Sequence, residues 1–141
     1  MNDIQIEEYP TKYAIYLRSN AGAQSESDHF TKIVQQREAT TAFVHERGGI
    51  VVQEYVCESS SASAASKELI NRMIRDARKG SFATVCVTDL SRLGRDAGAT
   101  EHRLIEERIS VECVDGSHTL KMKNHVLKMV SGVKWYRRPP V

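Results

Sequence analysis

The chain has 141 residues, of which 40% are hydrophobic and 27% charged, and its formal net charge is +2. This length and composition are typical of one domain with its own core, and no apolar run is long enough to span a bilayer. The first ten residues lack a basic segment followed by an apolar one, and the three cysteines lack zinc spacing. We therefore expect a cytoplasmic protein without a bound metal or another cofactor.

Short apolar runs alternate with segments of helical spacing from residue 13 onward. Nearly continuous apolar runs are typical of parallel strands that are covered on both faces. The predicted strands are 13–17, 50–56, 83–87 and 110–114, and the predicted helices are 29–47, 69–79, 98–108 and 120–131. This order predicts an α/β fold of three layers, in which a central, mostly parallel sheet of four or five strands has helices on both faces.

The loops after the first three predicted strands should meet at one edge of this sheet, where such folds bind ligands. They are residues 18–28, 58–66 and 91–96. The third loop carries Arg92 and Arg95, and guanidinium groups match the oxygens of a phosphate. Ion pairing or simple solvation of these arginines remains an alternative. No glycine-rich nucleotide motif is present, which argues against a dinucleotide or NTP site.

The C-terminal segment is basic. Residues 117–141 contain six Lys or Arg and no Asp or Glu. We expect a domain of residues 1–116, followed by a short basic helix and tail at 117–141 in place of a separate DNA-binding domain. Lys134, Arg137 and Arg138 flank an aromatic pair, which suits contact with DNA phosphates and bases. A solvated C-terminus is the alternative.

Several segments of the chain together resemble the catalytic domain of the serine recombinases, the resolvase and invertase family. The resemblance covers roughly residues 12–115 and rests on Tyr16-Leu17-Arg18, Gln24, Gln36-Arg37, Gly48, Glu54-Tyr55-Val56, Ser61, Asp76-Ala77-Arg78-Lys79-Gly80 and Leu90-Ser91-Arg92-Leu93-Gly94-Arg95. Members of that family cut DNA by attack of a serine hydroxyl on a phosphodiester, while arginines stabilise the developing charge. The resemblance implies DNA as the partner, assembly into dimers or higher oligomers, and phosphate-handling roles for Arg18, Gln24, Arg92 and Arg95.

The position of the nucleophile departs from the family pattern. Counting from Tyr16 and back from Gln24 places Asn20 where the family has its serine. A carboxamide is not a nucleophile for phosphoryl transfer. Ser19 lies one residue earlier, and such a slip would aim its hydroxyl in another direction.

Three further positions depart from that pattern. Cys57 and Ser91 stand where acidic residues are expected, and Lys67 stands where an arginine is expected. Lysine keeps the charge but loses the bidentate geometry of arginine. We therefore expect a site with a positive rim that lacks the carboxylates that would orient its arginines.

Three functions remain open from the sequence. We favour a DNA-binding accessory or regulatory subunit in site-specific recombination, acting as a homo-oligomer or with an active recombinase. One alternative is an active recombinase that uses Ser19 or a serine of the 59–66 loop. Another is a protein-interaction module that keeps the fold without binding DNA. The five histidines show no ligand spacing and are expected to be surface or packing residues.

Overall fold

The computed structural model of this protein describes residues 10–19, 26–58 and 64–117. Each strand and helix that was predicted within these ranges is present, with somewhat different bounds. A short 3-10 helix after the third strand was not predicted, and the predicted helix 120–131 lies outside the described residues. The elements are β1 (Thr11–Arg18), α1 (Glu26–Glu46), β2 (Gly49–Cys57), α2 (Ala64–Arg78), β3 (Thr84–Val87), η1 (Leu90–Leu93), α3 (Ala97–Glu106) and β4 (Ser110–Cys113).

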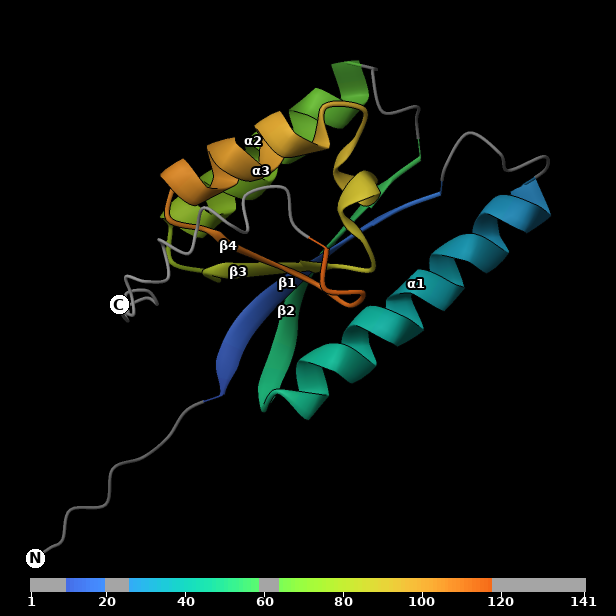
Figure 1. Cartoon of the computed structure of the whole chain (residues 1–141), viewed down its shortest axis with the longest axis horizontal. Coiled ribbons are helices and arrows are strands. Elements are labelled where there is room, and N and C mark those ends of the chain that lie inside the picture. The colour runs from blue at the N-terminus through green and yellow to red at the C-terminus, as the bar shows by residue number, and fades with distance from the viewer. Residues whose placement is uncertain (1–9, 20–25, 59–63, 118–141) are drawn as a thin grey trace, which may run out of the picture.

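The strands of the described part of the chain form one sheet in the order β2-β1-β3-β4. All three neighbouring pairs are parallel. Helix α1 covers one face of the sheet, and α2 and α3 lie together over the other face (Figure 1). The predicted α/β architecture with three layers is therefore confirmed, with four parallel strands.

Strand β1 is buried on both faces of the sheet, which explains its continuous apolar run. Ala14 and Tyr16 belong to the core under α2 and α3. Tyr13, Ile15 and Leu17 belong to the core under α1. Because successive side chains of a strand point to opposite faces, a strand between two helical layers has no position left for a polar residue. The first charged side chain that follows this run is Arg18, at the carboxyl end of the strand.

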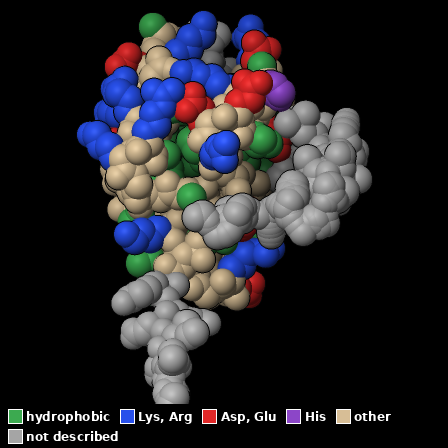
Figure 2. Space-filling model, turned by 90° about the vertical axis from the view of Figure 1, so that its left-hand side faces the viewer, with side chains coloured by type: hydrophobic (Ala, Val, Ile, Leu, Met, Phe, Trp, Pro, Cys, Tyr) green, Lys and Arg blue, Asp and Glu red, His purple; other side chains and the backbone are tan. Residues whose placement is uncertain are grey.

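Basic side chains gather at the other end of the sheet. Figure 2 shows Lys and Arg side chains, mixed with acidic ones, over the part of the surface where α2 and α3 end. The last turns of these helices contain Arg75, Arg78 and Arg103. Cations at the C-terminus of a helix interact favourably with its dipole, and Arg78 also pairs with Glu107 at 2.7 Å. These charges therefore have a structural explanation.

Among the helices of the described part of the chain, none combines the length and the apolar character that crossing a membrane requires.

Candidate functional site

The carboxyl ends of β1 and β3 meet, and the segment after β3 contacts the end of β1. Arg92 of η1 donates from Nη1 to the carbonyl oxygen of Arg18 at 2.9 Å. The predicted convergence of two arginines on this edge is therefore confirmed for Arg18 and Arg92. In open parallel sheets this edge is where ligands bind, so it defines the candidate site.

The side chain of Arg18 joins the end of β1 to η1. Its Nε donates to the carbonyl oxygen of Arg92 at 3.0 Å, and its Nη2 donates to that of Ser91 at 2.6 Å. Only 7% of Arg18 is exposed. A guanidinium this deeply buried needs such partners, because an unpaired buried charge is very costly. Two of its nitrogens are thus occupied by backbone oxygens and do not face an open site.

Gln36 holds the backbone of Arg18 from the opposite side. Its Oε1 accepts the Arg18 N–H at 3.0 Å, and its Nε2 donates to the Arg18 carbonyl oxygen at 2.9 Å. Gln36 is buried within the inward face of α1, between Ile33 and Thr40. Sequence reasoning used this glutamine only as part of the resemblance and missed its role. A polar residue at a core-facing helical position was the available signal.

Asp89 orients Arg92, although we expected the orienting acid to be missing because Ser91 stands at its position. Asp89 Oδ2 lies 3.3 Å from Nε of Arg92, and the Ser91 hydroxyl donates to Asp89 Oδ1. The 3-10 turn of η1 brings residues three apart onto one side, so an acid at 89 reaches Arg92. That expectation was wrong: the carboxylate is supplied from two residues earlier.

The electrostatics of this pair favour an ionised Asp89. Partial burial by itself would raise the pKa of Asp89. The hydrogen bond from Ser91, the charge of Arg92 and the hydrogen bond from Thr88 together outweigh the effect of burial and lower that pKa below its ordinary value. Asp89 therefore stays negative near neutral pH and holds the guanidinium of Arg92 in place.

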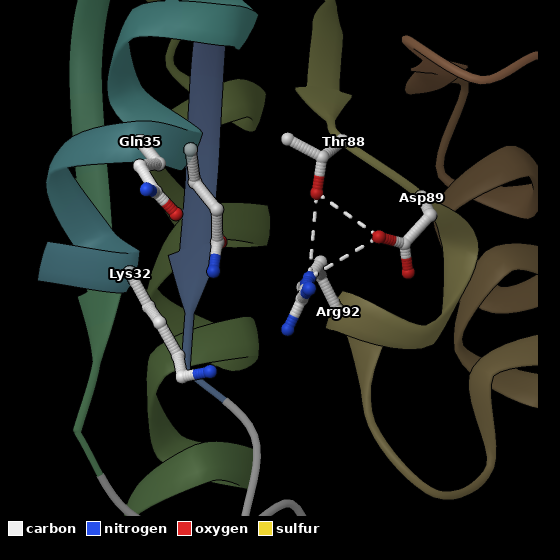
Figure 3. Close-up of a pocket in the computed structure, with 6 residues that line it drawn as sticks. Lys32, Gln35, Thr88, Asp89 and Arg92 are labelled. Atoms are coloured by element: carbon white, nitrogen blue, oxygen red, sulfur yellow. Dashed lines mark hydrogen bonds and ion pairs between the residues drawn. The ribbon is translucent and has the colours of Figure 1, made fainter. Parts of the chain in front are cut away.

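A cavity of about 270 Å³ lies between α1 and the segment that follows β3. Figure 3 shows Lys32 and Gln35 of α1 on one side of it and Thr88, Asp89 and Arg92 on the other. Gln36 completes the lining. The cavity thus combines two cationic side chains, one carboxylate and several neutral polar groups, which is suited to a small anion.

The other predicted site residues are distributed around this centre or fall outside the described residues. Lys67 is exposed in the first turns of α2, and Arg95 is exposed directly after Gly94. Gly94 has a φ of 114°, a conformation that favours glycine and that ends η1 before Arg95. The structure thus places Arg95 and Lys67 on the surface. The residues that lie outside the described ranges are Asn20, Gln24, Lys134, Arg137 and Arg138.

The hydroxyl of Ser19 is hydrogen-bonded to Nδ1 of His29, in the first turn of α1. Ser19 is 7% exposed, and Nε2 of His29 is buried without a hydrogen-bond partner in the described structure. The expectation that every histidine is a surface or packing residue was therefore wrong for His29. His102 is an exposed surface residue, as expected, with its Nε2 3.1 Å from Oε2 of Glu106. The Ser19–His29 contact joins segments ten residues apart, and helical periodicity gave no sign of it.

Several solved structures share this arrangement of strands and helices. The N-terminal catalytic domain of TP901-1 integrase is 22% identical, with a TM-score of 0.61 over 85% of this chain and 90% of that chain. A resolvase family site-specific recombinase from Streptococcus pneumoniae is 24% identical, with a TM-score of 0.63 over 86% of each chain. The C-terminal catalytic domain of ISC1926 TnpA, an IS607-like serine recombinase, is 17% identical, with a TM-score of 0.60 over 86% of this chain and 81% of that chain. The fold is that of serine recombinase catalytic domains.

The sequence profile of the family described as "Resolvase, N terminal domain" matches residues 13–139. This chain therefore belongs to the resolvase family of serine recombinases, a family that acts in site-specific recombination. No curated protein sequence matches it.

Proposed function

We propose that this chain is a DNA-binding protein of site-specific recombination that has lost all or nearly all strand cleavage and acts as an accessory or regulatory subunit. The observation that carries this proposal is found at the end of β1. The family's serine position is occupied by Asn20, whose carboxamide cannot attack a phosphodiester. The exposed side chains of Arg95 and Lys67, together with Arg92, support a retained contact with phosphate.

The DNA contact in this proposal is electrostatic. Lys and Arg side chains bind backbone phosphates with little regard to sequence and release counterions on doing so. Arg92 is oriented by Asp89, and Arg95 and Lys67 are exposed, which supports their availability to a phosphate. The proposed DNA-binding residues are Lys67, Arg92, Arg95, Lys134, Arg137 and Arg138, whereas Arg18, which was expected among them, is buried and bound to backbone oxygens.

The partners of the chain are part of the same proposal. We propose assembly as a homodimer or a higher oligomer, or joining of an active recombinase, because members of the family act as assemblies. Sedimentation velocity of the purified chain tests self-association directly: a concentration-independent monomer would leave only the mixed assembly.

A paired assay of binding and cleavage tests the proposal. Binding to a fluorescent duplex is measured over a series of salt concentrations, and covalent protein–DNA adducts are trapped after incubation with supercoiled DNA. We expect salt-sensitive binding and no adduct. An adduct formed by the unaltered chain would contradict the loss of cleavage, and no binding at low salt would favour a protein-interaction module instead.

A second candidate function, an active recombinase, is favoured by one observation, the hydrogen bond between Ser19 and His29. In this function Oγ of Ser19 attacks phosphorus, its proton passes to Nδ1 of His29, and the oxygen of the leaving strand departs and takes up a proton. The adduct should then disappear in Ser19→Ala and weaken strongly in His29→Ala. Ser27→Ala, which removes an exposed hydroxyl of α1, is the matched control. An adduct that survives Ser19→Ala excludes this candidate.

A further inference from the structure

Lys32 is the one charged side chain that α1 contributes to the cavity beside Arg92. Its side chain extends from α1 on the wall of the cavity that lies opposite Arg92 (Figure 3). Lys32 is half-buried and forms no ion pair with any residue in the described part of the chain. It belongs to none of the segments that carry the resemblance to serine recombinases. Its ammonium group is therefore a cation in a cavity without an explained structural partner.

The opposite wall of the cavity holds Arg92 in one orientation. Nε of Arg92 contacts Thr88 at 3.3 Å and Asp89 at 3.3 Å, while Nη1 donates to the Arg18 carbonyl oxygen. Nη2 takes no part in these contacts. A guanidinium that is fixed through two of its nitrogens is preorganised to bind an anion with the third, because little side-chain entropy is left to lose.

The charges of the cavity match a single negative ligand. Lys32 and Arg92 each carry a positive charge, and Asp89 carries one negative charge, which leaves a net charge of +1. A phosphodiester of a nucleic-acid backbone carries one negative charge and accepts hydrogen bonds from both kinds of cation. The volume of about 270 Å³ is far larger than the roughly 30 Å³ share of one water, so a phosphate group fits with its hydration.

We propose that Lys32 is an additional DNA contact, which binds one backbone phosphate together with Arg92. This inference rests on the proposed function, because it names a further residue of the same DNA-binding edge. It places one phosphate between α1 and η1, so that the helix beside the site contributes to holding the DNA backbone. Gln35, on the same wall, has an amide group that can donate to the phosphate or to its water.

The test compares variants in the binding assay with a fluorescent duplex. Lys32→Gln should lower the affinity about fivefold to tenfold at 0.1 M salt and make the slope of log K against log salt less negative by about one. Lys32→Arg, which keeps the charge, should keep the slope. The matched control is Lys79→Gln, an exposed lysine just beyond the end of α2, and it should leave both quantities unchanged.

Other results would overturn the inference. If the unaltered chain binds DNA and Lys32→Gln shows the same slope, Lys32 is not a phosphate contact although the proposed function stands. An equal loss in Lys79→Gln would show that only overall charge matters, or that DNA lies at the other end of the sheet. If the unaltered chain does not bind even at low salt, the proposed function fails and the role of Lys32 fails with it. Thermal unfolding of each variant, followed by circular dichroism, confirms that the compared proteins are folded.

Discussion

Two neighbouring regions of the candidate site use cationic side chains in opposite ways. At the junction of β1 and η1, Arg18 is buried and two of its nitrogens donate to backbone oxygens. In the cavity beside it, Lys32 and Arg92 face open space across from each other. The comparison teaches that an arginine of a family motif, here Arg18, can have a structural role in a given chain. A lysine outside the motif, here Lys32 of α1, can then supply the positive charge that is available to a ligand.

The first prediction breaks the junction directly. Arg18→Ala leaves the carbonyl oxygens of Ser91 and Arg92 without a charged donor, so we expect a loss of about 3 kcal/mol in the free energy of unfolding. Urea denaturation measures this loss. The comparison variant is Arg37→Ala, which removes an ion pair with Glu54. Because the Arg37 side chain is 41% exposed, this variant should lower the free energy of unfolding by less than about 1 kcal/mol. Unchanged stability with lost DNA binding would show that Arg18 serves mainly as a phosphate ligand.

A smaller effect is expected when the junction is weakened from the side of α1. Gln36→Ala removes both hydrogen bonds to the backbone of Arg18 and leaves its buried N–H unsatisfied, which should cost about 2 kcal/mol. Gln35→Ala, at the exposed neighbouring position, is the matched control and should be nearly neutral. Similar urea midpoints for both variants would contradict the role assigned to Gln36.

The third prediction concerns the pH dependence of the Asp89–Arg92 pair. The pKa of Asp89 is lower in the folded state than in the unfolded state. The ionised carboxylate therefore contributes fully to the free energy of unfolding above the unfolded pKa of about 3.9, and this contribution is lost as the pH falls through the lower folded pKa. Asp89→Asn should therefore cost about 1 kcal/mol at pH 7. The difference from the unaltered chain should shrink below about pH 4, as followed by unfolding at several pH values. A constant difference down to pH 2 would mean that ionisation of Asp89 does not stabilise the fold.

The smallest effect on stability is expected for an exposed arginine of the rim. Arg95→Gln should change the free energy of unfolding by less than about 0.5 kcal/mol, because the side chain is exposed. If Arg95 binds a phosphate, the same variant should make the salt slope of DNA binding less negative by about one. If the salt slope of DNA binding is unchanged in this variant, Arg95 does not contact DNA, and this result leaves the proposed roles of Lys32 and Arg92 unaffected.

The sequence was sufficient to predict most of the fold for a physical reason. Burial on both faces gives β1 a continuous apolar run, and the stripe of Ile70, Met73 and Ile74 marks α2 by its helical spacing. The 3-10 helix η1 was missed because four residues show no period. The convergence of Arg18 and Arg92 was predictable, since parallel strands bring their carboxyl ends to one edge.

The contacts within the site could not be predicted in the same way. Whether a guanidinium meets a phosphate or a carbonyl depends on the path of the following loop, which composition does not specify. Nothing in the sequence singled out Lys32, which the structure places opposite Arg92. His29 lay ten residues from Ser19, with no spacing rule to connect them. These are tertiary relations between short polar segments, for which sequence periodicity carries no signal.

The carboxylate of Asp89 has a consequence for any attempt to rebuild a family-type site in this chain. Ser91→Asp alone would introduce the acid that the resemblance predicts at this position but would crowd a second anion against the first, and the like charges would compete for one guanidinium. Building such a site therefore requires that positions 89 and 91 be changed together. A double-mutant cycle of Ser91→Asp with Asp89→Thr should show a strongly favourable coupling energy, whereas additive effects would mean that the two positions act independently of each other.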